Sequence, residues 1–488
     1  MLPSTVTILF AGKPLNCRRG SSVAVALWEH GIRVLSHSPK YGRPRGLHCA
    51  RGQCTDCLMR IDGQPNVRAC LTEVRDGLRV ERQGSGAWYG RLLRWVVASS
   101  EGLLPSGFYF KWFTRPAWLS RLFLKGIRPL TGFGKLPEPG SWYSPSASHQ
   151  AASGRAEADL GRFDRVVVGG GSSGLLAATR AVGQSAGRVL LVDDFPEPGG
   201  HRWRALAELA TAFGPEMCGL TVLARAWRQL QAARHGFLAH PDLDTAWSNR
   251  VVAAYPPDQL LLRNAEGLAT VRAGSVAWHA GALDRIGLFA SNDLPGIWGP
   301  RALYRLLCHD RLQVAERDVI VCGGGLDLWL AAALLQVRGA RVQLVLTAGG
   351  WQDELEAALA MPWPLHAGLE LTAARAGRSG NPIGRFSRSP LALEFSANAG
   401  TAPPLILTAD LAIVARRGKP VYDIPYQLGA DLVLRPEYGG YLPAAADPAA
   451  AADHHTVLPG GIELWVGGEA LGQSAAACLA PSSEEAPS

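Results

Sequence analysis

Two stretches of this sequence repeat one pattern, in which a short apolar run is followed by a glycine-rich turn, a helix-length segment and a second apolar run. The first run covers residues 165–168 and turns at 169–174, and the second begins at residue 318 and turns at 323–325. Strand, turn, helix and strand in this order predict a βαβ unit of a parallel sheet. We therefore expect two nucleotide-type units, and 488 residues leave room for about one further domain.

The first turn, residues 169–174, fits the pattern G-x-G-x-x-G directly after an apolar strand and before a helix. Gly169 allows the tight turn, Gly171 lets a pyrophosphate approach the helix N-terminus, and Gly174 lets helix and strand pack closely. Asp193 ends the next strand and can accept a hydrogen bond from a ribose hydroxyl. A purely structural glycine turn is the alternative. The predicted dinucleotide site comprises Gly169, Gly170, Gly171, Ser172, Ser173, Gly174 and Asp193.

The second turn departs from this pattern in two places. Leu328 stands where the third glycine belongs, and the strand after the helix ends at Leu346 and Thr347 without an acid. Both departures weaken the case for an NAD(P) site. Two interpretations stay open for this unit: a site that binds NAD(P), and a Rossmann-like fold without a nicotinamide nucleotide.

Four of the nine cysteines lie close together, in the spacing Cys49-x4-Cys54-x2-Cys57 followed by Cys70. A loop that wraps a [2Fe–2S] cluster needs three thiolates at short, unequal spacing and a fourth from an adjacent segment. Structural zinc sites usually present two C-x2-C pairs, and only one is found here. We predict a [2Fe–2S] cluster on these four cysteines, with zinc and uncoordinated structural thiols as the alternatives.

The other polar residues supply no further motif. The nucleotide-type regions contain no C-x-x-C pair, so a dithiol–disulfide mechanism lacks its residues. Because no His, Lys or Arg stands in a context that assigns it to a substrate carboxylate or a base, we predict no catalytic residue. Arginines near the cluster form either a positive surface around it or ordinary solvated side chains; they are Arg43, Arg45, Arg51 and Arg68. Most of the single cysteines are expected to be buried free thiols; they are Cys17, Cys218, Cys308, Cys322 and Cys478.

The composition, with 47% hydrophobic and 18% charged residues, is typical of a folded globular protein. The net charge of +8 permits an anionic partner, but without a recognition motif we expect no nucleic-acid binding. No apolar run has the length of a membrane-spanning helix and no secretory signal is evident, so we expect a cytoplasmic protein. Residues 91–135 combine basic and aromatic side chains. Packing between domains, docking of a partner subunit and peripheral contact with the inner face of a membrane stay open for them.

Further segments accompany these motifs along nearly the whole chain; they are residues 38–46, 66–70, 107–111, 127–134, 192–194, 198–201, 291–296 and 465–470. Through them the chain resembles the α subunits of heteromeric, flavin-dependent amine and amino-acid oxidases and dehydrogenases. That family includes heterotetrameric sarcosine oxidase, hydrogen cyanide synthase and the opine, proline and hydroxyproline dehydrogenases. The sequence shows no counterpart of the aminomethyltransferase-like half of the sarcosine oxidase subunit, so we expect no folate-linked reaction.

The resemblance implies an α/β fold with an α+β N-terminal module. A β-grasp, ferredoxin-like domain would precede the two dinucleotide-binding domains of a flavoprotein disulfide-reductase-like fold. The expected divisions are 1–83 for the [2Fe–2S] domain, 84–160 for a connector and linker, 161–310 and 406–479 for the FAD-binding domain, 311–405 for the NAD(P)-binding-like domain, and 480–488 for a disordered tail.

The resemblance also implies FAD rather than NAD at residues 169–174. Further FAD contacts would come from Asp194, Gly200, His201, Gly468 and Glu469. Glu469 replaces the usual Asp, and His279-Ala280 replaces a usual Ala-Thr, so local contacts with the FAD are expected to differ.

Three hypotheses about function follow. In the first, the chain is the electron-transfer subunit of an amine or amino-acid dehydrogenase or oxidase complex. By resemblance, the substrate would be oxidised at the FAD of a separate β subunit, and electrons would pass through this chain to quinone, oxygen or a carrier protein. An additional flavin at the subunit interface stays open. The second hypothesis is a self-contained NAD(P)H-dependent flavin and iron–sulfur reductase. The third is a nucleotide-binding scaffold without a redox role.

Overall fold

A computed structural model describes residues 4–38, 43–82, 115–127, 158–184, 187–347, 363–376, 390–397, 403–444, 454–458 and 461–471. Most of the basic–aromatic segment, the greater part of the linker, the C-terminal tail and Cys478 lie outside the described residues, and the predictions for them stay predictions.

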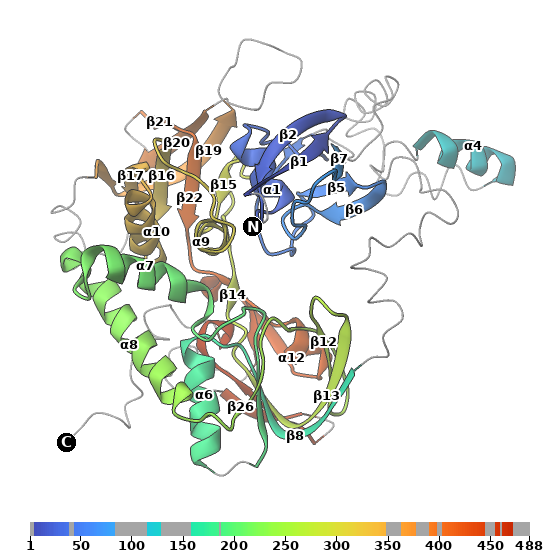
Figure 1. The fold of residues 1–488 in the computed structure, drawn as a ribbon, viewed down its shortest axis with the longest axis vertical. Helices are drawn as coiled ribbons and strands as arrows, with labels where there is room; N and C mark the ends of the chain where they lie inside the picture. The colour runs from blue at the N-terminus through green and yellow to red at the C-terminus, as the bar shows by residue number, and fades with distance from the viewer. Residues whose placement is uncertain are drawn as a thin grey trace.

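The N-terminal domain is a five-stranded mixed sheet with one helix against it (Figure 1). The strand order is β2-β1-β7-β5-β6, with β1 antiparallel to β2 and parallel to β7. The strands and the helix are β1 Thr5–Phe10, β2 Lys13–Arg18, α1 Val23–Glu29, β5 Leu58–Ile61, β6 Gln64–Arg68 and β7 Arg79–Arg82, and a small pair is formed by β3 Ser36–His37 and β4 Pro44–Arg45.

The apolar spacing of residues 23–35 predicts one amphipathic helix over this whole range, but α1 ends at Glu29. Gly31 adopts a φ of 76°, a left-handed conformation that few other residues tolerate, and Ile32 N then donates to the carbonyl oxygen of Leu27. This is the hydrogen bond with which a glycine commonly closes a helix. The prediction was wrong because the apolar periodicity outweighed this stop signal.

The second sheet contains the first glycine turn and follows the order β10-β9-β8-β13-β12-β11. Strand β8 lies between β9 and β13 and runs parallel to both, and the C-terminal strand β27 lies parallel to the other edge of β13. The chain therefore returns to complete this unit. Its elements are β8 Ala158–Val168, α6 Ser172–Gly183, β9 Val189–Val192, α7 Trp203–Phe213, α8 Thr221–Leu238, β10 Asp244–Ala246, β11 Arg250–Tyr255, β12 Gln259–Arg263, β13 Leu268–Trp278, β26 His454–Val457 and β27 Glu463–Val466.

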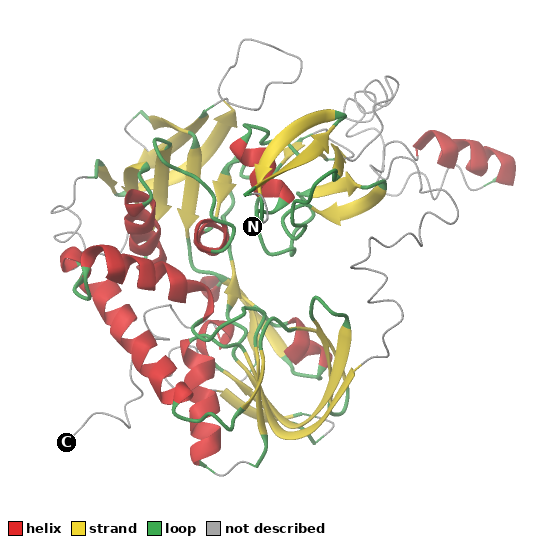
Figure 2. Ribbon diagram, in the orientation of Figure 1, coloured by secondary structure: helices red, strands yellow, loops and turns green. Residues whose placement is uncertain are grey.

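The third sheet contains the second glycine turn, between β16 and α10, and follows the order β15-β22-β16-β17-β18, all parallel. Helices α9 and α10 pack against its strands, and Figure 2 shows these helices and strands side by side. The elements are β15 Ile297–Trp298, α9 Pro300–Cys308, β16 Asp318–Gly323, α10 Leu326–Val337, β17 Arg341–Leu346, β18 Leu365–Ala367 and β22 Leu411–Ala415, beside a three-stranded sheet of β19 Leu369–Ala376, β20 Leu391–Ala397 and β21 Leu405–Ala409. Smaller elements are β14 Ala282–Leu283, β23 Lys419–Pro420, α12 Asp423–Gln427, β24 Leu432–Arg435 and β25 Gly440–Pro443.

The N-terminal domain is packed firmly on the second nucleotide-type unit, because one cluster of buried apolar side chains runs through both. The rings of Trp28 and Trp298 lie 4.6 Å apart, and Trp298 Nε1 donates a hydrogen bond of 2.7 Å to the carbonyl oxygen of Leu47. Arg33 donates to the backbone oxygen and the carboxylate of Asp410. Buried aromatic pairs and satisfied buried polar groups of this kind hold two domains in a fixed relation.

Helix α4, Ala117–Ile127, is the described part of the basic–aromatic segment (Figure 1). Trp118 is 66% exposed and Leu122 is 62% exposed. These two side chains are therefore not packed between the domains; the three interpretations of the segment as a whole stay predictions. Among the described residues, no helix combines the length and apolar character needed to cross a bilayer.

Candidate cofactor sites

The first glycine turn joins β8 to α6, and two of its glycines are required by close backbone contacts. Gly169 has a φ of 114°, and a Cβ there would lie 2.1 Å from the carbonyl oxygen of His279. A Cβ on Gly174 would lie 1.7 Å from the carbonyl oxygen of Gly169. By contrast, a Cβ on Gly171 would meet nothing within 4 Å. The turn therefore needs two glycines for packing and leaves open space at the N-terminus of α6.

A cavity, called the turn cavity here, opens at that N-terminus. Its wall includes Gly169, Gly171, Ser172, Ser173, Asp193, Asp194, Gly200, His201 and Glu469, so most of the predicted FAD contacts come together in it. Gly170, Gly174 and Gly468 are not on the wall. Because the free N–H groups and the dipole of a helix N-terminus favour anions, this wall fits a pyrophosphate.

Asp193, the predicted ribose acceptor, is buried and tied to the turn itself. Its carboxylate accepts hydrogen bonds from the backbone N–H groups of Gly170 and Phe195. Burial and the neighbouring charge of Asp194 raise the pKa of Asp193 to about 7, against the lowering effect of those two hydrogen bonds. Asp193 therefore fixes the turn and still faces the cavity, where each carboxylate oxygen can accept a further hydrogen bond.

Asp194 is held by two arginines. Its carboxylate accepts from Arg51 Nη2 at 3.0 Å and from Arg250 Nη2 at 2.6 Å. Burial would raise the pKa of Asp194, but the two guanidinium charges outweigh it and hold the pKa well below its usual range. Arg51 belongs to the cysteine loop, so this carboxylate joins the N-terminal domain to the first nucleotide-type unit. From the sequence, Arg51 is expected only as part of a positive surface around the cluster or as a solvated side chain. In the structure its side chain is mostly buried and pairs with Asp194 of the neighbouring unit.

A second cavity, called the loop cavity, has a volume of about 550 Å³ and lies between the two domains. The cysteine loop contributes Arg51, Gly52 and Gln53 to its wall, and the wall also includes Val168 at the end of β8 and Asp193 directly after β9. The cysteine loop therefore closes over the same strand ends that carry the glycine turn.

The cysteine loop is shaped to bring donors to sulfur. Cys49 Sγ accepts hydrogen bonds from the backbone N–H groups of Arg51 at 3.5 Å, Gln53 at 3.3 Å and Cys54 at 3.3 Å. Left-handed φ angles at Ala50 (52°) and Gly52 (71°) make this wrapping possible. Several N–H donors around one sulfur stabilise the thiolate form that ligates iron.

The four predicted ligands contact one another. Hydrogen bonds from Cys54 and Cys70 lower the pKa of Cys49, and a hydrogen bond from Cys70 lowers that of Cys57. Donation to these acceptors, together with burial, raises the pKa of Cys54 and Cys70. Among the described residues, no group of three or more His, Cys, Asp or Glu side chains is already spaced to hold a metal ion. Three observations support a cluster here: the shape of the loop, the backbone N–H groups that donate to Cys49 Sγ, and the hydrogen bonds that bring the four thiols together.

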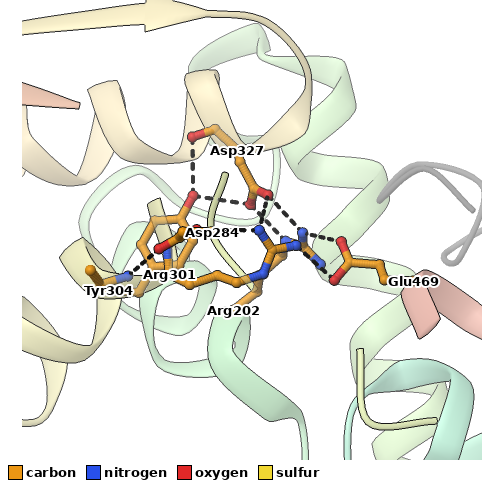
Figure 3. A network of polar contacts seen from close by, with 7 residues as sticks. Arg202, Asp284, Arg301, Tyr304, Asp327 and Glu469 are labelled. Atoms are coloured by element: carbon orange, nitrogen blue, oxygen red, sulfur yellow. Dashed lines mark hydrogen bonds and ion pairs between the residues drawn. The ribbon is translucent and has the colours of Figure 1, made fainter. Parts of the chain in front are cut away.

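A network of buried charges lies beside the turn cavity (Figure 3). Arg202, in the 3-10 helix Gly200–Arg202, donates two hydrogen bonds of 2.8 Å to Asp327 and one of 2.6 Å to Glu469. Arg301 Nη2 donates to the other oxygen of Glu469 at 2.8 Å. These side chains join the first unit to α9 and α10 of the second.

Two further groups complete the network (Figure 3). Asp284 accepts from the Arg301 side chain and from the backbone N–H groups of Arg301 and Ala302, and Tyr304 donates to Asp327. Burial would raise the pKa of Asp327, but Arg202 and Arg301 hold it well below its usual range. A paired carboxylate thus stands in the first turn of α10, where a second dinucleotide would place its pyrophosphate.

Two histidines also face the turn cavity. Burial and the adjacent charges of Arg202 and Arg301 lower the pKa of His201 well below 6.5, so its imidazole is neutral at pH 7. The His201 ring stacks on Tyr304 at 6.2 Å. His279 is 4% exposed and its backbone N–H bonds Val168 at the end of β8. The departure from the family pattern at His279 is therefore accommodated at the strand end.

Residues 4–85 match a family described as a 2Fe-2S iron-sulfur cluster binding domain. The hydrogen cyanide synthase subunit HcnA of Pseudomonas aeruginosa is 39% identical over 80 residues, which cover 16% of this chain and 76% of that subunit. The prediction of a [2Fe–2S] domain is confirmed, and the assignment of its four ligands stays a prediction.

The sarcosine oxidase subunit alpha of Rhizobium meliloti is 32% identical over 218 residues, which cover 43% of this chain and 20% of that subunit. The chain thus spans about a fifth of this relative. The resemblance to α subunits of this kind, predicted from the motifs, is confirmed.

The crystal structure of L-proline dehydrogenase from P. horikoshii has the same fold. It superposes with a TM-score of 0.55 at 18% sequence identity, over 96% of this chain and 70% of that one. The fold prediction, an iron–sulfur domain followed by two dinucleotide-binding units of the flavoprotein type, is confirmed.

Proposed function

We propose that this chain is the electron-transfer subunit of a heteromeric, FAD-dependent amine or amino-acid dehydrogenase or oxidase complex. The observation that carries the proposal is the contact of Arg51 with Asp194, because it sets the cysteine loop against the turn of the dinucleotide site. A one-electron and a two-electron site would then lie side by side in one chain.

The turn cavity is the proposed FAD site. The N-terminus of α6 would bind the pyrophosphate, with Ser172 and Ser173 on the same wall. Asp193 would accept from a ribose hydroxyl, and neutral His201 also lies on the wall of this cavity. A bound flavin supplies the capacity to accept two electrons and release them singly.

The four clustered cysteines are the proposed ligands of the [2Fe–2S] centre. Cys57 and Cys70 are buried and Cys49 and Cys54 half-buried, which limits access of water to the sulfurs. The backbone donors to Cys49 stabilise negative charge there. The centre would pass single electrons onward to an acceptor.

Partners are proposed from the relatives. The names of sarcosine oxidase subunit alpha and hydrogen cyanide synthase subunit HcnA state that both are subunits of larger enzymes. We propose that a separate, FAD-containing β subunit oxidises the amine or amino acid, and that this chain carries the electrons to quinone, oxygen or a carrier protein. The exposed Trp118 and Leu122 of α4 are candidates for contact with that subunit.

Reduction by NAD(P)H is the weaker candidate, because Asp327 places a buried carboxylate at the N-terminus of α10. That carboxylate and its two arginines occupy the position that a second pyrophosphate would need. The scaffold hypothesis is disfavoured by the open N-terminus of α6 and by the four converging thiols.

A cysteine variant tests the proposal without the partner. The anaerobically purified chain should contain two irons and a flavin, and illumination with EDTA should reduce the flavin and produce the EPR signal of the reduced cluster. Cys54→Ser should lose the iron and the signal while still binding flavin when FAD is supplied in excess. Cys17→Ser, which changes a buried thiol outside the loop, should keep both. An EPR signal that persists in Cys54→Ser, or a flavin that transfers no electron to the cluster, would contradict the proposal.

A further inference from the structure

Arg51 lies in the loop between Cys49 and Cys54, yet its side chain lines both the turn cavity and the loop cavity. We propose that Arg51 binds a phosphate oxygen of the dinucleotide, so that the iron–sulfur domain completes the FAD site of the neighbouring unit. This inference rests on the proposed function, because it takes the turn cavity as the site of FAD.

The position of the Arg51 side chain is fixed from three sides. Its Nη2 donates to both carboxylate oxygens of Asp194, at 3.1 and 3.0 Å. Its guanidinium lies 5.3 Å from the centre of the Phe195 ring, and its backbone oxygen accepts from Arg250 Nη1 at 3.2 Å. The side chain is 14% exposed. A side chain held in this way is oriented before the ligand arrives.

One end of the guanidinium is still available. The hydrogen bonds of Arg51 to Asp194 both start at Nη2, and Nη1 has no hydrogen-bond partner among the described residues. Arg51 Nε is buried without a hydrogen-bond partner. Nη1 is not among the buried atoms of this kind. Nη1 therefore has access to open space, and a guanidinium suits a phosphate oxygen in both charge and geometry.

The balance of charge favours an anion at this place. Arg51 and Arg250 carry two positive charges against the single negative charge of Asp194, while burial raises the pKa of Asp193 to about 7 and so reduces its charge near neutrality. Arg202, the other arginine on the wall of the turn cavity, is already paired with Asp327 and Glu469. Of the two arginines on that wall, Arg51 is therefore the one that can bind a pyrophosphate oxygen.

A consequence is that FAD binding and the order of the cysteine loop are coupled. The loop that holds Cys49 also positions Arg51, so a bound dinucleotide stabilises the loop, and an intact cluster strengthens dinucleotide binding by the same factor. The iron–sulfur domain is then part of the flavin site as well as a carrier beside it.

The test compares three purified full-length variants, using FAD retention on gel filtration and the dissociation constant measured by flavin fluorescence. Arg51→Met should weaken FAD binding by about 10- to 100-fold, the loss of one or two charge-assisted hydrogen bonds. Arg51→Lys should lie between Arg51→Met and wild type. Iron content should stay near wild type, since the backbone N–H of Arg51, which bonds Cys49, is kept.

Arg33→Met is the matched control, because Arg33 also anchors the N-terminal domain through a half-buried carboxylate, that of Asp410, but lies on neither cavity wall. It should lower thermal stability and leave the FAD dissociation constant unchanged. Equal weakening by Arg33→Met and Arg51→Met would mean that domain docking alone matters, and an unchanged constant in Arg51→Met would refute the contact. A wild-type chain that binds no FAD would instead overturn the proposed function.

Discussion

The two glycine turns of this chain have the same local architecture and opposite surroundings. In the first, residues 169–174 leave the N-terminus of α6 open to a cavity. In the second, Leu328 is fully buried in place of a glycine and Asp327 fills the N-terminus of α10 with a paired carboxylate. The fold alone therefore does not make a dinucleotide site; the side chains of the first helical turn decide whether an anion can enter.

The largest effect on FAD binding is expected from a side chain added to the first glycine turn. Gly174→Ala adds a Cβ 1.7 Å from the carbonyl oxygen of Gly169, a backbone atom that cannot move aside without opening the turn. We expect loss of bound FAD and about 1–3 kcal/mol of destabilisation. Flavin absorbance after gel filtration and urea unfolding measure these effects.

Gly183→Ala in the same helix is the control, because its Cβ meets nothing within 4 Å. It should retain FAD and unfold no earlier than wild type. Retention of FAD by Gly174→Ala would show that the first turn accepts a side chain at this position, as the second does at Leu328. The proposed difference between the two turns would then be wrong.

The second prediction concerns the charge at the second turn. Asp327→Ala removes one of the two carboxylate partners of Arg202 and leaves Arg202 to share the single charge of Glu469 with Arg301, so we expect a loss of about 3 kcal/mol in the free energy of unfolding. Asp318→Ala, at the exposed start of β16, should cost little. Urea unfolding followed by circular dichroism gives both values. A small loss in Asp327→Ala would mean that the network of buried charges does not stabilise the fold.

The third prediction is the pH dependence of the stabilisation that Glu469 gives through its ion pairs with Arg202 and Arg301. Burial would raise the pKa of Glu469, but Arg202 and Arg301 lower it from about 4.5 to about 2. Because the folded-state pKa is below the unfolded one, the stabilisation is fully present above pH 4.5 and is lost as the pH falls towards 2. Wild type should therefore exceed Glu469→Gln in unfolding free energy by about 2 kcal/mol at pH 7. The difference should shrink at pH 3, and a constant difference would contradict the assigned pKa.

Sequence reasoning located the features that depend on short-range spacing. The turn at 169–174 and the four clustered cysteines are defined by neighbours in the chain, so both could be predicted from residue type and spacing. The contact of Arg51 with Asp194 could not, because 143 positions separate the two residues and only the packing of the domains joins them. The same holds for Arg202 and Asp327, which are 125 positions apart. The end of α1 was missed although Gly31 signalled it.

The central claim, that a flavin and a cluster form one electron-transfer unit fed by a partner rather than by NAD(P)H, is tested most directly by anaerobic reduction of the isolated chain. Iron, sulfide and flavin are quantified on one sample, which is then reduced with dithionite or with NADH and followed by visible absorbance and EPR. We predict flavin bleaching and a cluster signal with dithionite and neither with NADH on the timescale of turnover. Rapid bleaching by NADH, or a chain without iron and flavin, would contradict the account.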